Sequence, residues 1–201
     1  MIYIEYFRRH LHIDPEDFHQ VMTSGFDRWG TQQSEDQLVL HAARTWRLGP
    51  EPEYFVVWYS SAFGFERFDS WERVFRSGAA DASQREYRRV GRIEFAGCYE
   101  PLLPPVPARN GTYYVEFVRA TGELPALRQF YQQRSQQHQQ LRLNLLVHRI
   151  GRLGPDPGGL ALWTIPSLAA LANIAGELDG VREPVQLEAA GTYQDIGKQI
   201  L

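Results

Sequence analysis

The chain is poor in cysteine and carries little net charge, and both features exclude classes of protein. Its 201 residues include a single cysteine, Cys98, so a disulfide framework or a metal site built from several cysteines is excluded. The formal net charge of −3 offers no electrostatic surface for a nucleic acid. We therefore expect no nucleic-acid partner.

Long hydrophobic runs and the common catalytic motifs are also missing. No run of about 18 apolar residues occurs, so the sequence predicts no membrane-spanning helix. The first ten residues carry charges within an apolar stretch, which predicts a strand rather than a signal peptide. No Gly-rich phosphate loop, Walker sequence or Gly-x-Ser-x-Gly elbow is present. We expect a soluble cytoplasmic protein without a tightly held cofactor.

A proline-rich segment divides the chain almost in half. Residues 101–111 hold four of the twelve prolines, and proline resists both helix and sheet because it fixes φ and lacks a backbone donor. The segment predicts a stiff extended linker. We expect a first repeat over residues 1–100, the linker over 101–111 and a second repeat over 112–201.

The two halves share three short sequence matches in the same order. The matches pair Ile4–Arg8 with Val115–Arg119, Arg47–Pro52 with Arg152–Pro157, and Glu94–Tyr99 with Glu188–Tyr193. Chance can produce one such match at a Pro-Gly turn, but three colinear matches indicate an internal duplication.

Each half predicts the same order of elements, β-α-β-β-α-β. The expected strands are Ile2–Arg8, Leu38–Arg47, Tyr54–Ser60 and Arg92–Tyr99, and then Tyr113–Arg119, Leu141–Arg152, Gly159–Ile165 and Val185–Tyr193. Helices are expected to begin after Asp14 and at Asp69 in the first half, and near Glu123 and after Ser167 in the second. This order is that of the ferredoxin-like unit.

Two such units in tandem resemble the dimeric α/β-barrel superfamily, and within it the NIPSNAP-like and EthD-like proteins. The resemblance rests on element order and on the repeat, and it covers nearly the whole chain. It implies an α+β fold in which two fused ferredoxin-like repeats form an intramolecular α/β barrel, with helices outside and a cavity between two sheets. A monomer would suffice for such a barrel, and a homodimer stays open.

Strand alternation divides the side chains between two faces. One parity is apolar in both halves and is expected under the helices, including Ile2, Ile4 and Tyr6. The opposite parity is expected to line the cavity. Its members would supply the catalytic groups Glu5, Glu116, His41 and His148 and the substrate-binding groups Tyr3, Tyr114, Asn144 and Thr45.

The two glutamates occupy equivalent positions of aromatic strands. A carboxylate is costly to bury there unless it is paired or protonated. One interpretation is a general acid or base whose pKa is raised by an apolar pocket. The alternative is an ion pair with a neighbouring strand, for which the equivalent residues Arg44 and Arg149 are available.

The histidines differ between the repeats, because His148 aligns with Ala43 rather than with His41. Either imidazole could move a proton near neutral pH, and either could be a hydrogen-bonded core residue. Asn144 would orient a substrate. His10 and His12 lie at a strand end, where we expect a solvated loop and no metal site.

These features predict a protein that binds and transforms a small apolar or aromatic metabolite by proton transfer, as an isomerase, lyase or cofactor-free oxygenase. An alternative is a NIPSNAP-like protein that binds a ligand or a partner without catalysis. The resemblance also includes haem enzymes such as chlorite dismutases, so a haem-binding barrel with His41 or His148 as axial ligand is a further alternative.

Overall fold

The computed structural model describes residues 1–32, 36–45, 48–51, 53–60, 66–78, 81–106 and 111–196. Eight strands form one closed barrel in the order β1-β3-β2-β8-β5-β7-β6-β4. Their bounds are β1 Ile2–Arg9, β2 Asp36–Arg44, β3 Tyr54–Ser60, β4 Gly91–Pro101, β5 Thr112–Ala120, β6 Arg142–Arg149, β7 Gly159–Ile165 and β8 Val185–Asp195. All eight predicted strands are present.

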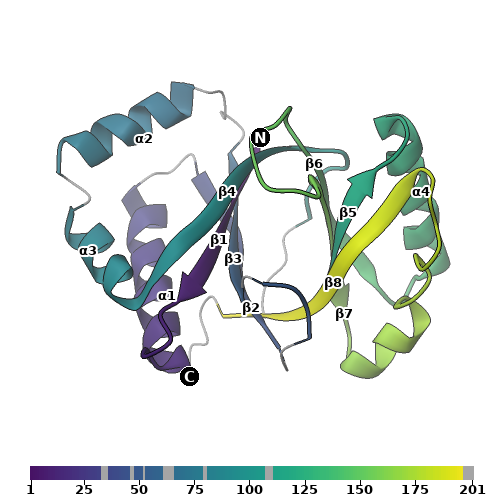
Figure 1. The fold of residues 1–201 in the computed structure, drawn as a ribbon, viewed down its shortest axis with the longest axis horizontal. Helices are drawn as coiled ribbons and strands as arrows, with labels where there is room; N and C mark the ends of the chain where they lie inside the picture. The colour runs from purple at the N-terminus through teal and green to yellow at the C-terminus, as the bar shows by residue number, and fades with distance from the viewer. Residues whose placement is uncertain are drawn as a thin grey trace.

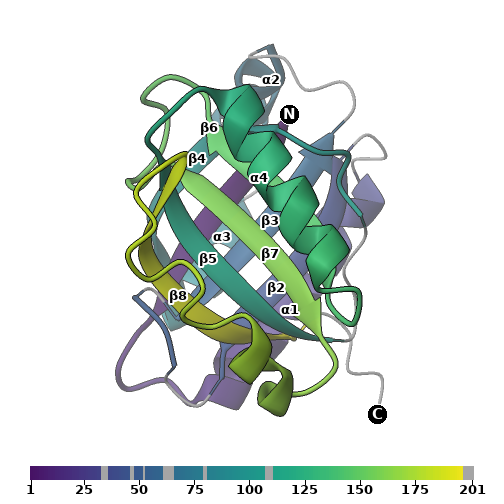
Figure 2. The ribbon, with the colours of Figure 1, turned by 90° about the vertical axis from the view of Figure 1, so that its right-hand side faces the viewer.

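The helices lie on two opposite sides of the barrel (Figure 1). The first repeat contributes α1 Pro15–Gln32, α2 Glu66–Arg76 and α3 Asp81–Val90, and the second contributes α4 Leu124–Gln137 and the 3-10 helix η1 Leu168–Asn173. We call β1–β4 of the first repeat the first sheet and β5–β8 of the second repeat the second sheet. Figure 2 shows α4 lying along the outer face of the second sheet. No helix in the described ranges is both long and apolar enough to cross a bilayer.

The start of α1 follows from its sequence, whereas the later helices differ from the prediction. The carboxylate of Asp14 accepts a hydrogen bond of 2.8 Å from the backbone of Glu16, and Pro15 takes the first helical position. The helix expected at Asp69 begins at Glu66 instead, and a second helix, α3, follows it. The helix expected after Ser167 is the short 3-10 helix η1 of six residues.

Two short strand pairings join the repeats. β2 pairs with β8 and β4 pairs with β6, each over three residue pairs. The proline-rich segment adds to the second junction, because the backbone N–H groups of Leu102 and Val106 donate to carbonyls of β6 residues at 2.8 Å. The segment is therefore held against β6 up to residue 106, and residues 107–110 lie outside the described ranges.

The predicted faces of the strands are reversed. The parity that includes Ile2, Ile4 and Tyr6 lies inside the barrel, where it packs against residues of the second sheet. The parity that includes Glu5 and Glu116 lies between the sheets and the helices. The physical reason is that two facing sheets exclude water most completely, so the wholly apolar faces meet there, while a helix can supply partners to a polar side chain.

The repeated sequence matches meet one another across the two junctions. Gly49, in the β2–β3 loop, lies against Gly191 of β8, and Gly154, in the β6–β7 loop, lies against Gly97 of β4. A Cβ atom on Gly191 would be 2.7 Å from the Cα of Gly49, and one on Gly97 would be 2.9 Å from the Cα of Gly154. Each loop thus docks on the other repeat at a contact that only glycine allows. Arg47 and Pro52 of the first motif lie outside the described residues.

Candidate functional site

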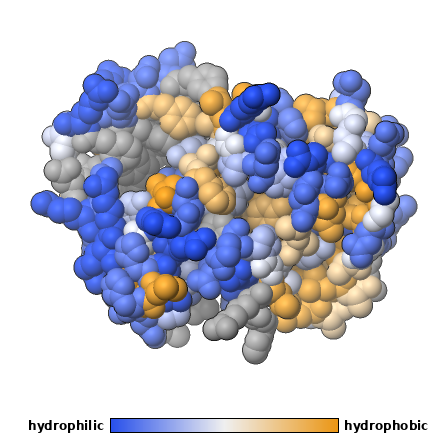
Figure 3. All heavy atoms as spheres, in the orientation of Figure 1, coloured by the Kyte–Doolittle hydropathy of each residue, from blue (hydrophilic) through white to orange (hydrophobic). Residues whose placement is uncertain are grey.

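A cavity of about 160 Å³ lies between the strands of the two repeats. Interior-facing side chains of β1, β4, β5 and β8 form its floor and walls, and the β2–β3 and β6–β7 loops form its rim. The lining residues are Tyr6, Pro50, Glu51, Phe95, Tyr99, Phe117, Pro155, Asp156, Pro157, Gly158, Gly159 and Ala189. Figure 3 shows hydrophobic surface near the middle of the face that it presents. Ile93 and Phe95 of β4 are exposed hydrophobic residues.

The walls of the cavity are aromatic. The ring of Tyr6 lies 4.8 Å from that of Phe95 and 6.5 Å from that of Phe117, measured between centroids. The hydroxyl of Tyr6 is hydrogen-bonded to that of Tyr99. Burial raises the pKa of both phenols, so both stay protonated near neutral pH and act as hydrogen-bonding groups rather than bases.

The rim carries one carboxylate from each repeat. Glu51 is 2.9 Å from the guanidinium of Arg44, and Asp156 is 2.9 Å from that of Arg149. Each arginine also donates to a carbonyl of its own loop, at 2.8 Å to Gly49 and 2.7 Å to Gly154. Arg44 and Arg149 therefore brace the rim loops and do not pair with Glu5 and Glu116 as the alternative interpretation proposed.

Equivalent positions of the two repeats contribute to the cavity as pairs, but with different side chains. Tyr6 is the equivalent of Phe117, and Phe95 is the equivalent of Ala189. The cavity thus lies where the repeats face each other, with a larger and more polar wall from the first repeat.

Glu116 is fixed in an ion pair with the helix above it. Its carboxylate accepts hydrogen bonds from the guanidinium of Arg134 at 3.0–3.1 Å, from the hydroxyl of Tyr131 at 3.0 Å and from the indole of Trp163 at 3.1 Å. The side chain is fully buried. With every acceptor position engaged, Glu116 has a structural environment rather than one suited to a general base.

Glu5 has a different environment although it is the repeat equivalent. Its carboxylate accepts a hydrogen bond of 3.0 Å from the indole of Trp58. Desolvation raises the pKa of Glu5 to about 7, and the bond from Trp58 opposes that shift. Of the predicted catalytic residues, Glu5 is the carboxyl group able to give or take a proton near neutral pH.

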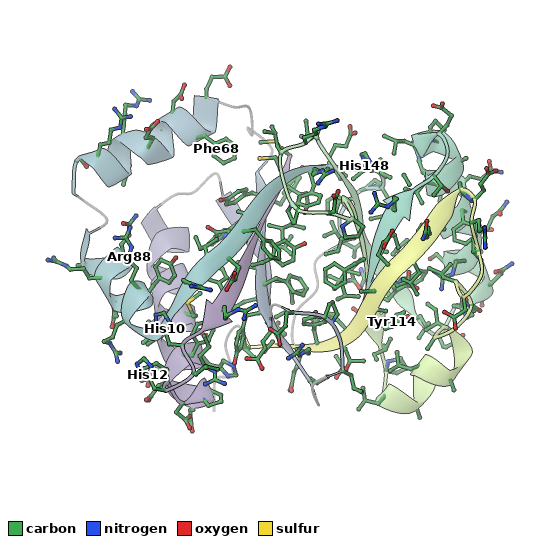
Figure 4. All side chains as sticks on the ribbon, viewed as in Figure 1. His10, His12, Phe68, Arg88, Tyr114 and His148 are labelled. Atoms are coloured by element: carbon green, nitrogen blue, oxygen red, sulfur yellow. The ribbon has the colours of Figure 1, made fainter. Side chains whose placement is uncertain are left out.

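The two histidines do not meet. His41 is buried on the helix side of β2, in register with Val56, which is in turn in register with Glu5, so Val56 separates the two predicted catalytic groups. Burial lowers the pKa of His41 to about 3. His148 lies near the β4–β6 junction (Figure 4), and burial lowers its pKa as well.

The predicted substrate-binding residues are dispersed. Tyr114 is buried beneath α4, and Tyr3 packs edge-on against Phe68 of α2 (Figure 4). Asn144 accepts from the backbone and hydroxyl of Thr164 at 3.0 and 2.6 Å.

Thr45 completes this group at the β2–β8 junction. Its hydroxyl is 2.7 Å from that of Thr192, so it joins the two repeats. The prediction that these eight residues line one cavity is therefore wrong, because their strand face is the outer one.

His10 and His12 lie side by side with parallel rings (Figure 4), 5.8 Å apart. The ring of His10 donates to the carbonyl of Arg88 at 3.0 Å. In the described part of the chain no group of three or more potential ligands is placed to hold a metal ion.

Haem does not fit the residues of this cavity. Its described lining includes no histidine, cysteine or methionine, and both candidate axial ligands face away from it. Its volume also lies below the roughly 300–1,000 Å³ typical of sites for drug-sized molecules. The space beneath α4 is filled by Tyr131, Trp163 and the Glu116–Arg134 pair.

No protein-family model and no curated protein matches the sequence. Solved structures do match the fold. A putative chlorite dismutase superimposes with a TM-score of 0.54 at 13% identity, over 98% of this chain and 95% of its own. A variant of the chlorite dismutase from Candidatus Nitrospira defluvii, in complex with cyanide, gives 0.55 at 11% identity, over 98% and 92%.

At these identities the likeness establishes the fold alone. The two-way coverage includes both repeats. The prediction of an α+β chain whose two fused ferredoxin-like repeats form one α/β barrel is thereby confirmed. The narrower resemblance to NIPSNAP-like or EthD-like proteins stays a prediction.

The sequence did not predict the rings that line the cavity on the inner face of the strands, nor the arginine that pairs with Glu116 on the outer face. Phe117 belongs to the parity expected under the helices, and the sequence assigns no face to the strand that holds Phe95, so neither ring is predicted to line a cavity. Arg134 interrupts the apolar stripe of α4, and an arginine on such a stripe together with a glutamate inside an aromatic strand signals a buried ion pair.

Proposed function

We propose that the protein binds a small molecule with a single aromatic ring in the cavity between its two sheets. The observation that supports this proposal is the size and lining of that cavity, about 160 Å³ with the rings of Tyr6, Phe95 and Phe117 in its wall. An apolar cavity of about 150 Å³ is known to take a benzene molecule.

The chemistry of the lining favours an aromatic molecule with one polar substituent. Ring faces and edges bind another ring by offset or edge-to-face packing. The hydroxyl pair of Tyr6 and Tyr99 offers a hydrogen-bonding group at one end, and the rim loops limit the length. A phenol satisfies all three requirements.

We propose binding rather than proton-transfer catalysis in this cavity. The four predicted catalytic groups, Glu5, Glu116, His41 and His148, lie on the other face of the strands. The two rim carboxylates are engaged with Arg44 and Arg149. This favours the second interpretation of the sequence, a ligand-binding protein of the NIPSNAP-like kind.

A titration with phenol tests the proposal. Ala189→Phe places in the second repeat the side chain that its equivalent, Phe95, has in the first, and so fills the cavity. Ala126→Phe on the exposed face of α4 is the matched control. We expect calorimetry to give the same Kd for the wild type and Ala126→Phe, and a Kd at least about tenfold higher for Ala189→Phe.

Thermal unfolding provides a second measurement. At a phenol concentration ten times Kd, binding adds about 1.4 kcal/mol and raises Tm by roughly 3–6 °C. Equal affinity for Ala189→Phe and the control would contradict the proposed site, and so would an absence of any phenol effect on the wild type.

A further inference from the structure

The two repeats hold the same carboxylate–indole pair between sheet and helix. In the first repeat the indole N–H of Trp58 donates to Glu5 at 3.0 Å, and in the second that of Trp163 donates to Glu116 at 3.1 Å. Glu5 and Glu116 are equivalent in the duplicated sequence, as are Trp58 and Trp163. The geometry was therefore retained in both copies.

In the second repeat a guanidinium completes this pair. Arg134 approaches both oxygens of Glu116 at 3.0–3.1 Å, and its guanidinium carbon lies 5.4 Å from the ring centroid of Trp163. A carboxylate and an aromatic face together form a strong cation site. The second repeat fills that site with its own side chain.

The first repeat has no such side chain at the equivalent helical positions. Met22 and Gly25 lie eight and eleven residues after Asp14, as Tyr131 and Arg134 lie after Glu123. A Cβ atom on Gly25 would meet no described heavy atom within 4 Å. Among the residues that the structure describes, no cationic group lies within ion-pair distance of Glu5.

The surroundings of Glu5 suit an organic cation. Glu5 keeps partial contact with solvent, whereas Glu116 is fully buried. Aromatic side chains from three elements share its face: Tyr3 stacks edge-on with Phe68 of α2, and Tyr87 of α3 stacks edge-on with Phe7 of β1. Figure 4 shows Phe68 on the side of α2 that faces the sheet.

We propose that Glu5 and Trp58, between the sheet and the helices of the first repeat, bind a small organic cation, an alkylammonium or a guanidinium. Its positive group lies against the carboxylate of Glu5 and the indole of Trp58, in the place that Arg134 takes in the second repeat. This site is separate from the cavity between the sheets, because it lies on the opposite face of β1.

The site couples cation binding to the ionisation of Glu5. Because burial raises the pKa of Glu5 to about 7, a bound cation that favours the carboxylate displaces a proton below that pH. Among the described residues, the other titratable groups near Glu5 do not change charge near neutrality: burial raises the pKa of Tyr3, Tyr87 and Cys98, and lowers that of His41 to about 3. Affinity should therefore increase as the pH rises through about 7.

Butylammonium and its neutral analogue 1-butanol are suitable probes. Four proteins are compared by calorimetry: the wild type, Glu5→Gln, the double variant Met22→Tyr/Gly25→Arg and the control Glu94→Gln. The double variant supplies the tethered cation of the second repeat. Glu94 is a glutamate of the same repeat whose partners are Arg8 and Arg92 on the surface.

We expect butylammonium to bind the wild type and Glu94→Gln equally, and Glu5→Gln and the double variant at least about tenfold more weakly. Butanol should bind the wild type at least about tenfold more weakly than butylammonium. The indole N–H resonance of Trp58 should shift on titration of the wild type, a readout that does not depend on how well any variant folds.

Several results would overturn the site. These are equal binding of butanol and butylammonium, undiminished binding by Glu5→Gln, or an unmoved Trp58 resonance at saturation. The variant Ala189→Phe separates this proposal from the one above, because it should abolish phenol binding and leave butylammonium binding unchanged.

Discussion

Single residues decide whether a buried carboxylate stabilises the fold. Glu116 and Glu5 occupy equivalent strand positions and accept equivalent indole hydrogen bonds, yet only Glu116 has a described guanidinium partner. Removing one partner of a buried ion pair leaves an uncompensated buried charge and lowers the free energy of unfolding. A buried carboxylate that has no cation already lowers the free energy of unfolding in the wild type. The two sites should therefore respond in opposite ways to mutation.

Arg134→Met should destabilise the protein by about 3–5 kcal/mol, because it leaves the Glu116 carboxylate buried without its cation. The exposed pair of Arg119 and Glu188 provides the control, and Arg119→Met should leave the free energy of unfolding nearly unchanged, because solvent screens a surface ion pair. Urea denaturation at pH 7 measures both. Equal effects of the two substitutions would show that the buried pair contributes nothing special.

Glu5→Gln should stabilise the protein at neutral and alkaline pH. The pKa of Glu5 is near 4.5 when unfolded and about 7 when folded, so the folded state binds the extra proton and wild-type stability falls as pH rises between those values. The amide does not titrate and can still accept from Trp58. Its advantage should grow from pH 4.5 to 7 and reach on the order of 2 kcal/mol.

Denaturation at pH 5 and pH 8 measures that difference. A stability gap that does not change with pH would mean that Glu5 titrates normally. A loss of stability at pH 8 would mean that an ion pair holds Glu5.

At the residue scale the sequence predicted the unusual glutamates and not their partners. A carboxylate inside an aromatic strand can be recognised from the sequence alone. Its cation lies 18 residues away for Glu116, on a helix whose rotation over the sheet is set by packing. The absence of such a cation at Gly25 is visible only when the two folded repeats are compared.

At the scale of elements, the β2–β3 and β6–β7 loops tie the repeats together through paired glycines. A side chain at Gly97 or Gly191 would push the docked loop away from its strand, because the nearest atoms of the loop backbone lie 2.9 and 2.7 Å from the new Cβ. The loops also form the rim of the cavity, so this contact links stability to the site.

Gly97→Ala and Gly191→Ala should each destabilise the protein by about 1–3 kcal/mol, the range typical of overpacking. Gly25→Ala is the control, since the space around it is open and alanine favours a helix, and it should stabilise by about 0.5–1 kcal/mol. Thermal unfolding compares the three variants. If the two strand substitutions are neutral, the loops are not docked as described.

Strand positions could be predicted from the sequence, but the direction of their faces could not. Tyr54–Ser60 and Gly159–Ile165 match the structure at both ends, because aromatic and β-branched runs bounded by turns specify strands well. Period-two alternation places Ile2 and Ile4 on one face of the strand and Tyr3 and Glu5 on the other. It does not determine which of the two faces points into the barrel. That choice depends on the helices, and the second helix of each half also differs from the prediction.

The two repeats share a single hydrophobic core inside the barrel. That core contains residues of both, including contacts between Tyr6 and Phe117 and between Phe55 and Tyr193. Neither sheet can bury its inner face alone. The existence of a barrel followed from the duplicated sequence, whereas the cavity did not, because its volume depends on how the two inner faces fit.

The separated repeats should not fold as monomers. Residues 1–100 and 112–201 produced alone should be poorly structured or self-associate, because each exposes the largely hydrophobic sheet face that forms the barrel core. Mixed together, they should form a 1:1 complex with the circular dichroism spectrum of the intact chain. Two independently folded monomers that ignore each other in size-exclusion chromatography would contradict the shared barrel and the predicted repeat boundaries.

The most direct test of a ligand site at the meeting point of the repeats is a crystal structure with 4-bromophenol, located by the anomalous signal of bromine. We predict one strong bromine peak in the cavity lined by the rings of Tyr6, Phe95 and Phe117, beneath the two rim loops. A peak elsewhere, or a cavity closed by the side chain of Phe95 with no bromine in it, would contradict the proposal.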